Sequence, residues 1–398
     1  MDIHTCDDIR PYLSEELPAI YSRLLQDPNF LSAVETIYPG MSQDEMKALL
    51  ATCTTNQLFQ KKCIYPMLQD ILRKASTGLT YDITNVTTAT THKDGIQDRG
   101  YTFITNHRDI ILDSAFLDCV LFEEDMDTVE IAIGDNLLIY PWIKDLVRIS
   151  RSFIVQRALT MRQMLTASKK MSDYMHYVIQ GKHSNLWIAQ REGRAKDSDD
   201  RTQDSVLKML AMGAYTDAPT PARTIIDSLM ELNITPMSIS YEYDPCDHLK
   251  AMEFQCKRDN PDWKKAPQDD LINMKTGMFG YKGHIHYHAA PCINDWISTL
   301  PADMPKTELF NHISAHIDHE IHSTYHLYPG NYCAADLLHG TTSLSSHYTA
   351  EDKARFEAYL EKKLSLITLS NPDIQYLRQR LLVMYANPVI NQQKAQQS

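Results

Sequence analysis

Apolar residues recur at two spacings along the chain, and the spacing changes from one region to the next. In residues 1–80 they fall three or four positions apart, which predicts amphipathic helices. From residue 81 onward, short runs such as 129–133 and 234–241 suit strands and alternate with helix-spaced segments. This alternation is typical of an α/β fold. We therefore expect a mixed central sheet flanked by helices, with a helical region before it and a helical extension after it.

The same patterns divide the chain into four regions. We expect a helical N-terminal region over 1–80, an α/β core over 81–267, a mostly helical C-terminal extension over 268–390 and a disordered tail over 391–398. Within the core, Thr220 and Pro221 predict the N-cap and first turn of a helix. The polar segment 242–267 is expected to be a loop with short helices.

Helix start and stop signals locate two further helices. Ser42 and Glu45 have the spacing of a capping box, which satisfies two backbone amides at a helix start. Gly181 ends a long amphipathic helix whose apolar residues are expected to face the core. Those apolar residues are Met161, Leu165, Met171, Met175 and Val178.

A histidine lies where one predicted strand gives way to a helix. Residues 101–104 suit a buried strand, and apolar residues from Ile110 onward have nearly helical spacing. His107 stands between the two, at the kind of strand end where α/β folds place their chemistry. We therefore centre the functional hypothesis on this histidine.

Two carboxylates, Asp109 and Asp113, follow His107. A carboxylate behind a histidine fixes the imidazole tautomer and stabilises the imidazolium that forms when the ring accepts a proton. The sequence has no G-x-S-x-G motif and no cysteine beside the pair, so we expect the substrate to supply the reacting hydroxyl. The alternative is that Asp109 caps the helix and that His107 is a satisfied loop residue.

Two other predicted strands end in charged residues. The strand over 151–157 ends in Arg157, and the strand over 185–190 runs into a loop dense in both signs of charge. Because strands of an α/β sheet present their carboxyl ends at one edge, we expect the charged side chains to face the same opening as His107. The loop contributes Arg191, Glu192 and Arg194.

Composition narrows the classes of function. The chain is 43% hydrophobic and 23% charged, as expected of a soluble globular protein, and its net charge of −12 argues against a nucleic-acid partner. The eight cysteines form no C-x-x-C pair, which suggests reduced thiols in a cytoplasmic protein. The acidic N-terminus predicts no secretory signal, and no apolar run approaches the ~20 residues of a membrane span.

Histidines are concentrated in the last third of the chain, which raises a competing hypothesis of metal binding. His284, His286 and His288 alternate as on one face of a strand, and His312, His316 and His319 have helical spacing. No H-E-x-x-H motif occurs, because the two histidines of His319-Glu320-Ile321-His322 are one residue too close. We therefore predict neither a catalytic metal nor a cofactor.

Four segments resemble, in order and spacing, the motifs of the glycerolipid acyltransferase family, which includes glycerol-3-phosphate and 1-acylglycerol-3-phosphate acyltransferases. They are FITNHRDIILD, GDNLLIYPWIKDLVRISRSFIVQR, LWIAQREGRAKD and ITPMSISYE. The matching residues are Asn106 and His107, then Gly134, Asn136, Leu137, Pro141, Phe153, Ile154 and Arg157, then Glu192, Gly193 and Arg194, and finally Pro236.

Two of the motifs depart from the family's pattern. Four residues separate the family's histidine and aspartate, whereas here Asp113 leaves five and Asp109 leaves one. We prefer Asp113 as the partner of His107. The family's Glu-Gly-x-Arg is shortened to Glu192-Gly193-Arg194, which leaves Arg191, Arg194 and Lys196 as alternatives for the phosphate contact.

The resemblance implies transfer of a fatty acyl group from acyl-CoA or acyl carrier protein to a hydroxyl of glycerol-3-phosphate or lysophosphatidic acid, in phospholipid biosynthesis. His107 would be the general base, with Asp113 or Asp109 behind it, and helix-start amides near Asp109 would stabilise the oxyanion. The expected substrate-binding residues are Arg108, Arg157, Arg191, Glu192, Gly193 and Arg194.

Because the implied products are lipids, we expect a cytoplasmic protein in peripheral contact with the inner face of the membrane, through the N-terminal helices or the final third. Two alternatives stay open. One is acyl transfer to a different hydroxyl or amine lipid; the other is a non-catalytic, histidine-rich metal-binding protein.

Overall fold

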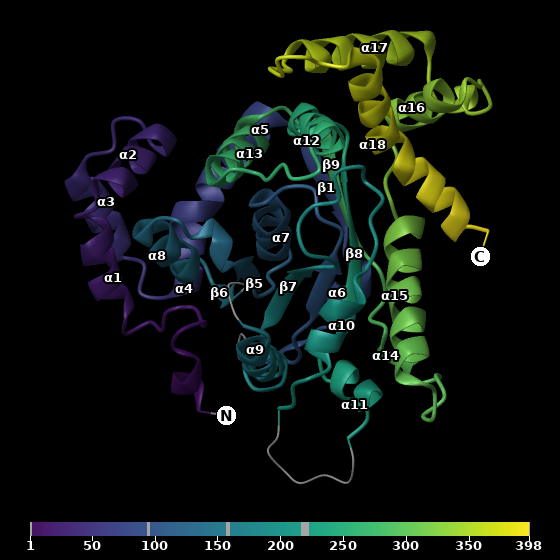
Figure 1. Cartoon of the computed structure of the whole chain (residues 1–398). Coiled ribbons are helices and arrows are strands. Elements are labelled where there is room, and N and C mark those ends of the chain that lie inside the picture. Colours follow the sequence, from purple (N-terminus) through teal and green to yellow (C-terminus); the bar gives the residue numbers. More distant parts are fainter. Residues whose placement is uncertain (1, 94–95, 157–159, 216–222, 398) are drawn as a thin grey trace.

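The computed structural model describes residues 2–93, 96–156, 160–215 and 223–397. At the centre of this described chain lies a seven-stranded mixed sheet, in the order β1-β9-β8-β4-β7-β5-β6 (Figure 1). The strands are β1 (Gly78–Asp82), β4 (Thr102–Thr105), β5 (Val129–Gly134), β6 (Ser152–Val155), β7 (Asn185–Ala189), β8 (Ile234–Tyr241) and β9 (His284–Ala289). A separate ribbon joins β2 (His92–Lys93) and β3 (Ile96–Gln97). The predicted α/β class with a mixed sheet is confirmed.

Five neighbouring strands of the sheet run in one direction, so their carboxyl ends meet at one edge. β8, β4, β7, β5 and β6 pair in parallel, whereas β9 is antiparallel to β8, and β1 is parallel to β9. Both faces of β4 are buried: Phe103 packs in the cluster that contains Phe116, and Ile104 packs in the cluster that contains Met175. A fully buried strand is expected where helices cover both faces of a sheet.

The N-terminal helices are η1 (Ile3–Cys6), α1 (Leu17–Leu24), α2 (Pro28–Ile37), α3 (Gln43–Ala51), α4 (Asn56–Phe59), the π-helix η2 (Gln60–Ile64) and α5 (Tyr65–Ala75). Among them, α1, α2 and α3 lie at the far side of the molecule from α15 (Lys306–Ser323) to α18 (Ile374–Ala395), whereas α5 packs beside α13 (Pro267–Phe279) (Figure 1). The predicted capping box is confirmed: Glu45 N donates to Ser42 Oγ, and Ser42 N donates to Glu45 Oε2.

The helices of the core lie between the strands in the sequence, or follow the last of the five parallel strands. They are α6 (Thr84–Thr87), α7 (Leu112–Glu123), η3 (Asp135–Leu137), α8 (Pro141–Ile149), α9 (Met161–Gln180), α10 (Asp204–Leu210), α11 (Ile225–Met230) and α12 (Asp247–Asp259).

Three local predictions about these helices need correction. Leu165, expected to face the core from α9, is 63% exposed. The predicted helix start at Thr220 and Pro221 lies outside the described residues, and α11 instead begins at Ile225 with Thr224 as its N-cap. The segment 242–267 was expected to be loop-like, yet it contains the 13-residue helix α12.

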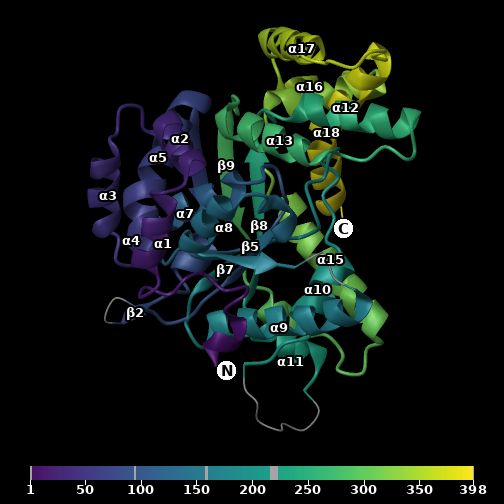
Figure 2. The same cartoon turned by 60° about the vertical axis from the view of Figure 1, so that its left-hand side comes forward.

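The central sheet continues beyond residue 267, where the α/β core was predicted to end. β9 lies between β8 and β1 in the central sheet, and its residues alternate between partly exposed and buried. The C-terminal helices are α13 (Pro267–Phe279), α14 (Asn294–Ile297), α15 (Lys306–Ser323), α16 (Pro329–His339), η4 (Ser345–His347), α17 (Ala350–Ser365) and α18 (Ile374–Ala395). Of these, α16, α17 and α18 form a group at one end of the molecule, beside α12 (Figure 2).

The Gln-rich tail, expected to be disordered from residue 391, instead continues α18 to Ala395. Asn391 is buried and donates to Asp199 Oδ1, and Gln392 donates to the carbonyl oxygen of Tyr325. These tertiary hydrogen bonds hold a segment whose composition alone suggested disorder. No helix in the described part of the chain is both long and apolar enough to cross a bilayer.

Candidate active site

The turn after β4 is fixed by a side chain that bridges to the next strand. Asn106 is fully buried, and its amide accepts from the backbone N of Ile239 at 2.8 Å and donates to the carbonyl of the same residue at 2.9 Å. On the other side, Gln190 N donates to Thr105 O at 2.8 Å. His107 therefore leaves the sheet edge from a loop that is held on both sides.

His107 is hydrogen-bonded to Asp113 in the first turn of α7. Its Nδ1 lies 2.8 Å from Asp113 Oδ2, and the imidazole and the carboxylate are 12% and 1% exposed. Because a carboxylate accepts this bond, Nδ1 carries the proton and Nε2 is left as the basic nitrogen. No described residue bonds Nε2. The ring packs edge-on against Trp187, with the centroids 5.6 Å apart, which further restricts its orientation.

The same oxygen of Asp113 also holds the loop that carries His107. Asp113 Oδ2 accepts from the backbone amides of Arg108 at 2.6 Å and of Asp109 at 3.0 Å. Three donors thus converge on one carboxylate oxygen, and they fix it relative to the imidazole. The carboxylate bonded to His107 is thus that of Asp113, the preferred partner, and its catalytic role stays a prediction.

Asp109 has the capping role that was left as the alternative. Its Oδ1 accepts from the amides of Ile111 at 2.9 Å and Leu112 at 2.8 Å. Burial, together with the nearby Asp113 carboxylate, raises the pKa of Asp109. The expectation that helix-start amides stabilise an oxyanion is wrong for the amides of residues 108, 109, 111 and 112, because Asp109 and Asp113 already bind them.

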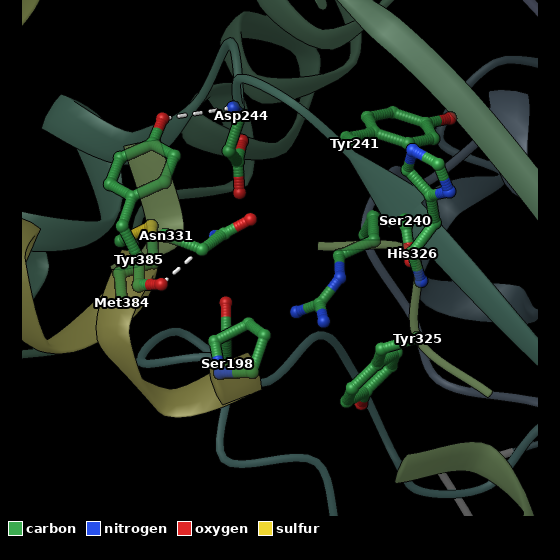
Figure 3. Close-up of a pocket in the computed structure, with 11 residues that line it drawn as sticks. Ser198, Ser240, Tyr241, Asp244, Tyr325, His326, Asn331, Met384 and Tyr385 are labelled. Atoms are coloured by element: carbon green, nitrogen blue, oxygen red, sulfur yellow. Dashed lines mark hydrogen bonds between the residues drawn. The ribbon is translucent and has the colours of Figure 1, made fainter. Parts of the chain in front are cut away.

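The Arg108 guanidinium lies in an ion pair beside a small cavity. Its Nη2 is 2.8 Å from Asp200 Oδ2, its side chain is 7% exposed, and Nη1 has no partner among the described residues. The other residues that line the cavity are Ser198, Ser240, Tyr241, Asp244, Tyr325, His326, Asn331, Met384, Tyr385 and Pro388. Figure 3 shows Met384 and Tyr385 of α18 on one side of it and Tyr241 and His326 on the other. Binding of substrate by Arg108 stays a prediction.

The loop after β7 places two arginines near the His107 loop. Arg194 Nη2 donates to Asn273 Oδ1 at 2.9 Å, and within the described chain Arg194 Nη1 and Arg191 Nε are buried without a hydrogen-bond partner. Burial alone would lower the pKa of Arg194, but the neighbouring Cys246, Asp244 and Asp109 raise it. The contribution of Asp109 reflects how close this guanidinium lies to the cap of α7.

The remaining residues of the loop after β7 differ in backbone conformation and in their partners. Gly193 has φ +68°, a left-handed conformation that favours glycine, and the exposed Glu192 donates its backbone N to Gln203 Oε1 at 2.8 Å. Lys196 is paired with Glu253. Among the ion pairs of the described residues, Lys196 is the one of the three candidates for a phosphate contact that pairs with a carboxylate. Arg157 lies outside the described residues.

Sequence reasoning missed two polar residues of this site, Asn273 and Lys282. Lys282 is completely buried; its Nζ donates to Gly280 O at 2.7 Å and to Met278 O at 3.1 Å, and burial lowers its pKa to about 8. Both residues come from the predicted C-terminal extension. No local motif marks either of them: Asn273 bonds to Arg194, 79 positions away, and Lys282 bonds to backbone carbonyls, which carry no sequence signal.

The clustered histidines lie on and beside β9, which β8 separates from β4 in the sheet. The Thr80 hydroxyl is 3.1 Å from His284 Nε2 and 2.8 Å from His286 Nδ1, and the rings of both histidines lie within 5.5 Å of the His326 ring. Burial and the neighbouring histidines lower the pKa of His286 to about 4. Among the residues that the structure describes, no three His, Cys, Asp or Glu side chains are placed to hold a metal ion.

Comparison with known proteins gives a match over the region that contains the His107–Asp113 dyad. Residues 84–217 match the family model described as Acyltransferase. The match includes His107, Asp113 and Arg194 but ends before β8 and α13. Among curated proteins, none matches the chain.

Proposed function

The chain is an acyltransferase, with a domain of the glycerolipid acyltransferase family at residues 84–217, and we propose that it esterifies a hydroxyl group of a glycerol phosphate. The acyl group comes from a thioester, on coenzyme A or acyl carrier protein. The acceptor is glycerol-3-phosphate or lysophosphatidic acid, and the reaction belongs to phospholipid biosynthesis.

His107 acts as the general base in this proposal. Its Nε2 takes the proton of the acceptor hydroxyl while the oxygen attacks the thioester carbonyl. Asp113, bonded to Nδ1 at 2.8 Å, stabilises the imidazolium that results. When the tetrahedral intermediate collapses, the carbon–sulfur bond breaks and the imidazolium returns its proton to the leaving thiolate. General-base assistance of this kind contributes about 10²–10⁴-fold to a rate.

The arginines after β7 provide the affinity for an anionic acceptor. Guanidinium groups bind phosphate oxygens with paired hydrogen bonds, and such charge-assisted bonds are stronger than neutral ones. In the described structure, Arg191 and Arg194 each keep a buried nitrogen without a partner, which leaves donors for an incoming anion. Arg157, which follows β6, is proposed to act with them.

One observation carries the proposal: among the described residues, a histidine with a carboxylate on Nδ1 and no partner on Nε2 lies at the same sheet edge as two incompletely paired arginines. The test is to incubate the purified protein with labelled palmitoyl-CoA or palmitoyl carrier protein and a panel of glycerol phosphates, and to identify the product by mass. An acylated glycerol phosphate made by the wild type but not by His107→Ala would support it. Equal turnover by the two proteins would exclude it.

Acyl transfer to a different hydroxyl or amine lipid is the second candidate, because the dyad alone does not select a phosphate. Arginine substitutions separate the two. If Arg157→Ala and Arg194→Ala both leave the KM of every accepted substrate unchanged, then the acceptor carries no phosphate.

We also propose peripheral contact with the cytoplasmic face of a membrane, through a corner beyond β5 and β6. Four large apolar side chains are exposed there: Ile139, Tyr140, Met164 and Leu165. They follow the carboxyl ends of two paired strands, at the edge that also holds His107. Lys144 and Arg162 are exposed in the same segments, so in an otherwise acidic protein this corner suits an anionic lipid surface.

Sedimentation with vesicles tests this contact. We expect wild-type protein to pellet with phosphatidylglycerol vesicles and the Ile139→Ser/Leu165→Ser variant to remain in solution. Ile272→Ser, which removes an equally exposed apolar side chain from α13, is the matched control and should still pellet. Wild-type protein that stays in the supernatant at low salt would refute the proposal.

A further inference from the structure

Helix α13 buries two residues that are unusual for a buried helix face. Asn273 and Gly277 lie one turn apart, so they share a face, and both are buried, whereas Ile272 and Phe279 of the same helix are exposed. An amphipathic helix normally buries its apolar residues instead. The face of α13 that turns inward thus presents an amide and a bare backbone to the polar loops beneath it.

Asn273 holds the guanidinium of Arg194. Its Oδ1 accepts from Arg194 Nη2 at 2.9 Å, and its own amide donates to Asp269 O at 2.7 Å. The second bond fixes which end of the amide faces the arginine. Its backbone carbonyl also accepts from Cys246 Sγ at 3.3 Å, which ties the helix to the start of α12. Arg194 is therefore aimed by a residue that lies outside the matched acyltransferase region.

Gly277 makes room for the carboxylate that caps α7. A Cβ atom at this position would lie 1.9 Å from Asp109 Oδ2, far inside any allowed contact. Asp109 cannot easily swing aside, because its Oδ1 is held by two backbone amides and the side chain is buried. Helix α13 is thus in close contact with the loop that also carries His107.

We propose that α13 is a positioning element of the active site, and that it sets the separation between the His107–Asp113 dyad and Arg194. Asn273 fixes the arginine, and Gly277 lets Asp109 and the dyad loop approach the same helix face. This inference rests on the proposed function, in which Arg194 binds the phosphate of the acceptor. A single rigid helix that touches both loops keeps the base and the phosphate at the spacing that the acceptor hydroxyl requires.

The first test replaces Asn273 with alanine. The loss of one hydrogen bond to Arg194 should raise the KM for glycerol-3-phosphate about 10-fold and leave kcat within about twofold, because the dyad is untouched. Lys275→Ala, an exposed change in the same helix, should alter neither constant. A purely structural role for Asn273 would instead lower the melting temperature without changing KM, and that result would overturn its assignment.

The second test is Gly277→Ala. In a helix without a close neighbour this change increases stability, since alanine has the higher helix propensity. Here it should lower the melting temperature and reduce kcat about 10-fold or more. Hydrogen exchange gives a readout that does not depend on activity: the amides of Arg108 and Asp109, which bond to Asp113, should lose protection. Unchanged or greater stability with full protection would refute the role of Gly277.

The two possible failures can be told apart. If His107→Ala retains full turnover, then the proposed function fails whatever α13 does. If His107→Ala is inactive while Asn273→Ala and Gly277→Ala both behave like Lys275→Ala, then the function stands and the positioning role of α13 is wrong.

Discussion

The histidine at the carboxyl end of β4 and the histidines on β9 occupy opposite environments in one sheet. His107 has a carboxylate on Nδ1 and a nitrogen without a partner among the described residues, whereas His284 contacts Tyr328 Oη through Nδ1 and Thr80 Oγ1 through Nε2. The neighbours of His284 and His286 are other imidazoles rather than a buried aspartate. The abundance of histidine in the last third is therefore a weaker indication of a catalytic site than the single histidine at the end of β4, whose two ring nitrogens have different surroundings.

The largest expected effect is the loss of activity in His107→Ala, which tests whether the two histidine environments differ in function. We expect kcat/KM to fall by at least about 10³-fold, because the proposed base is lost, while circular dichroism and the melting temperature show a folded protein. His288→Ala, on β9, should remain within about twofold of wild type in the same assay. If the two variants lost similar activity, the distinction between the two histidine environments would be meaningless.

The next largest effect is expected when Asp113 and Asp109 are each replaced by asparagine, which tests which carboxylate assists His107. Asp113→Asn should lower kcat about 10²-fold, because a neutral amide neither fixes the tautomer nor stabilises the imidazolium. Asp109→Asn keeps an oxygen that can accept the capping amides, so its kcat should fall less than about fivefold. The measurement is kcat at saturating acceptor for both variants, and the reverse order would assign the dyad to Asp109.

The arginines of the β7 loop should affect binding more than chemistry. We expect Arg194→Ala to raise the KM for glycerol-3-phosphate about 10- to 100-fold with a smaller effect on kcat, since a charge-assisted hydrogen bond contributes about 1.5–3 kcal/mol. Arg201→Ala, which removes a half-exposed arginine further along the same loop, is the control. The measurement is steady-state kinetics with varied acceptor concentration. If Arg194 did not contact the phosphate, Arg194→Ala would change kcat without raising the KM.

The smallest expected effect is a pH dependence of stability that comes from the β9 cluster. Burial lowers the pKa of His286 to about 4 and also lowers the pKa of His326, so the unfolded chain binds more protons than the folded one. This stability is fully present above the ordinary histidine pKa of about 6.5 and is lost as the pH falls toward 4. We expect a melting temperature about 2–4 °C lower at pH 5 than at pH 7.5 from this cluster.

The variant His286→Gln isolates that contribution. It removes the titrating group but keeps a polar side chain beside Thr80, so the part of the pH dependence that belongs to the cluster should disappear. A fall in melting temperature between pH 7.5 and pH 5 that is the same in wild type and variant would assign the pH dependence to other groups.

The sequence predicted those parts of the fold that local patterns determine. The strand over 234–241 agrees with β8 to the residue, and the start of α3 follows from Ser42 and Glu45. It also located His107 at a strand end and favoured Asp113 as its partner. These features depend on alternation, capping and spacing over fewer than ten residues, which a single sequence displays directly.

Features that depend on distant partners could not be predicted in this way. β9 belongs to the central sheet because it pairs with β8 and with β1, and β1 is more than 200 positions earlier in the sequence. Asn273 looks like any polar residue of a helix until Arg194 is placed beside it. The tail at Asn391 is ordered by hydrogen bonds to Asp199 and Arg201, which composition does not reveal.

The pairing of β4 with β8 has a consequence for how the protein folds during its synthesis. β4 carries the dyad loop at its end, and one of its two flanking strands lies beyond the region that matches the acyltransferase family. While the ribosome has produced only the first 217 residues, the backbone donors and acceptors on one side of β4 have no strand to pair with. An unpaired strand edge of this kind can pair with other chains and cause aggregation. The nascent protein therefore needs shielding until residues 234–241 emerge, and a fragment cut at residue 217 should aggregate rather than turn over substrate.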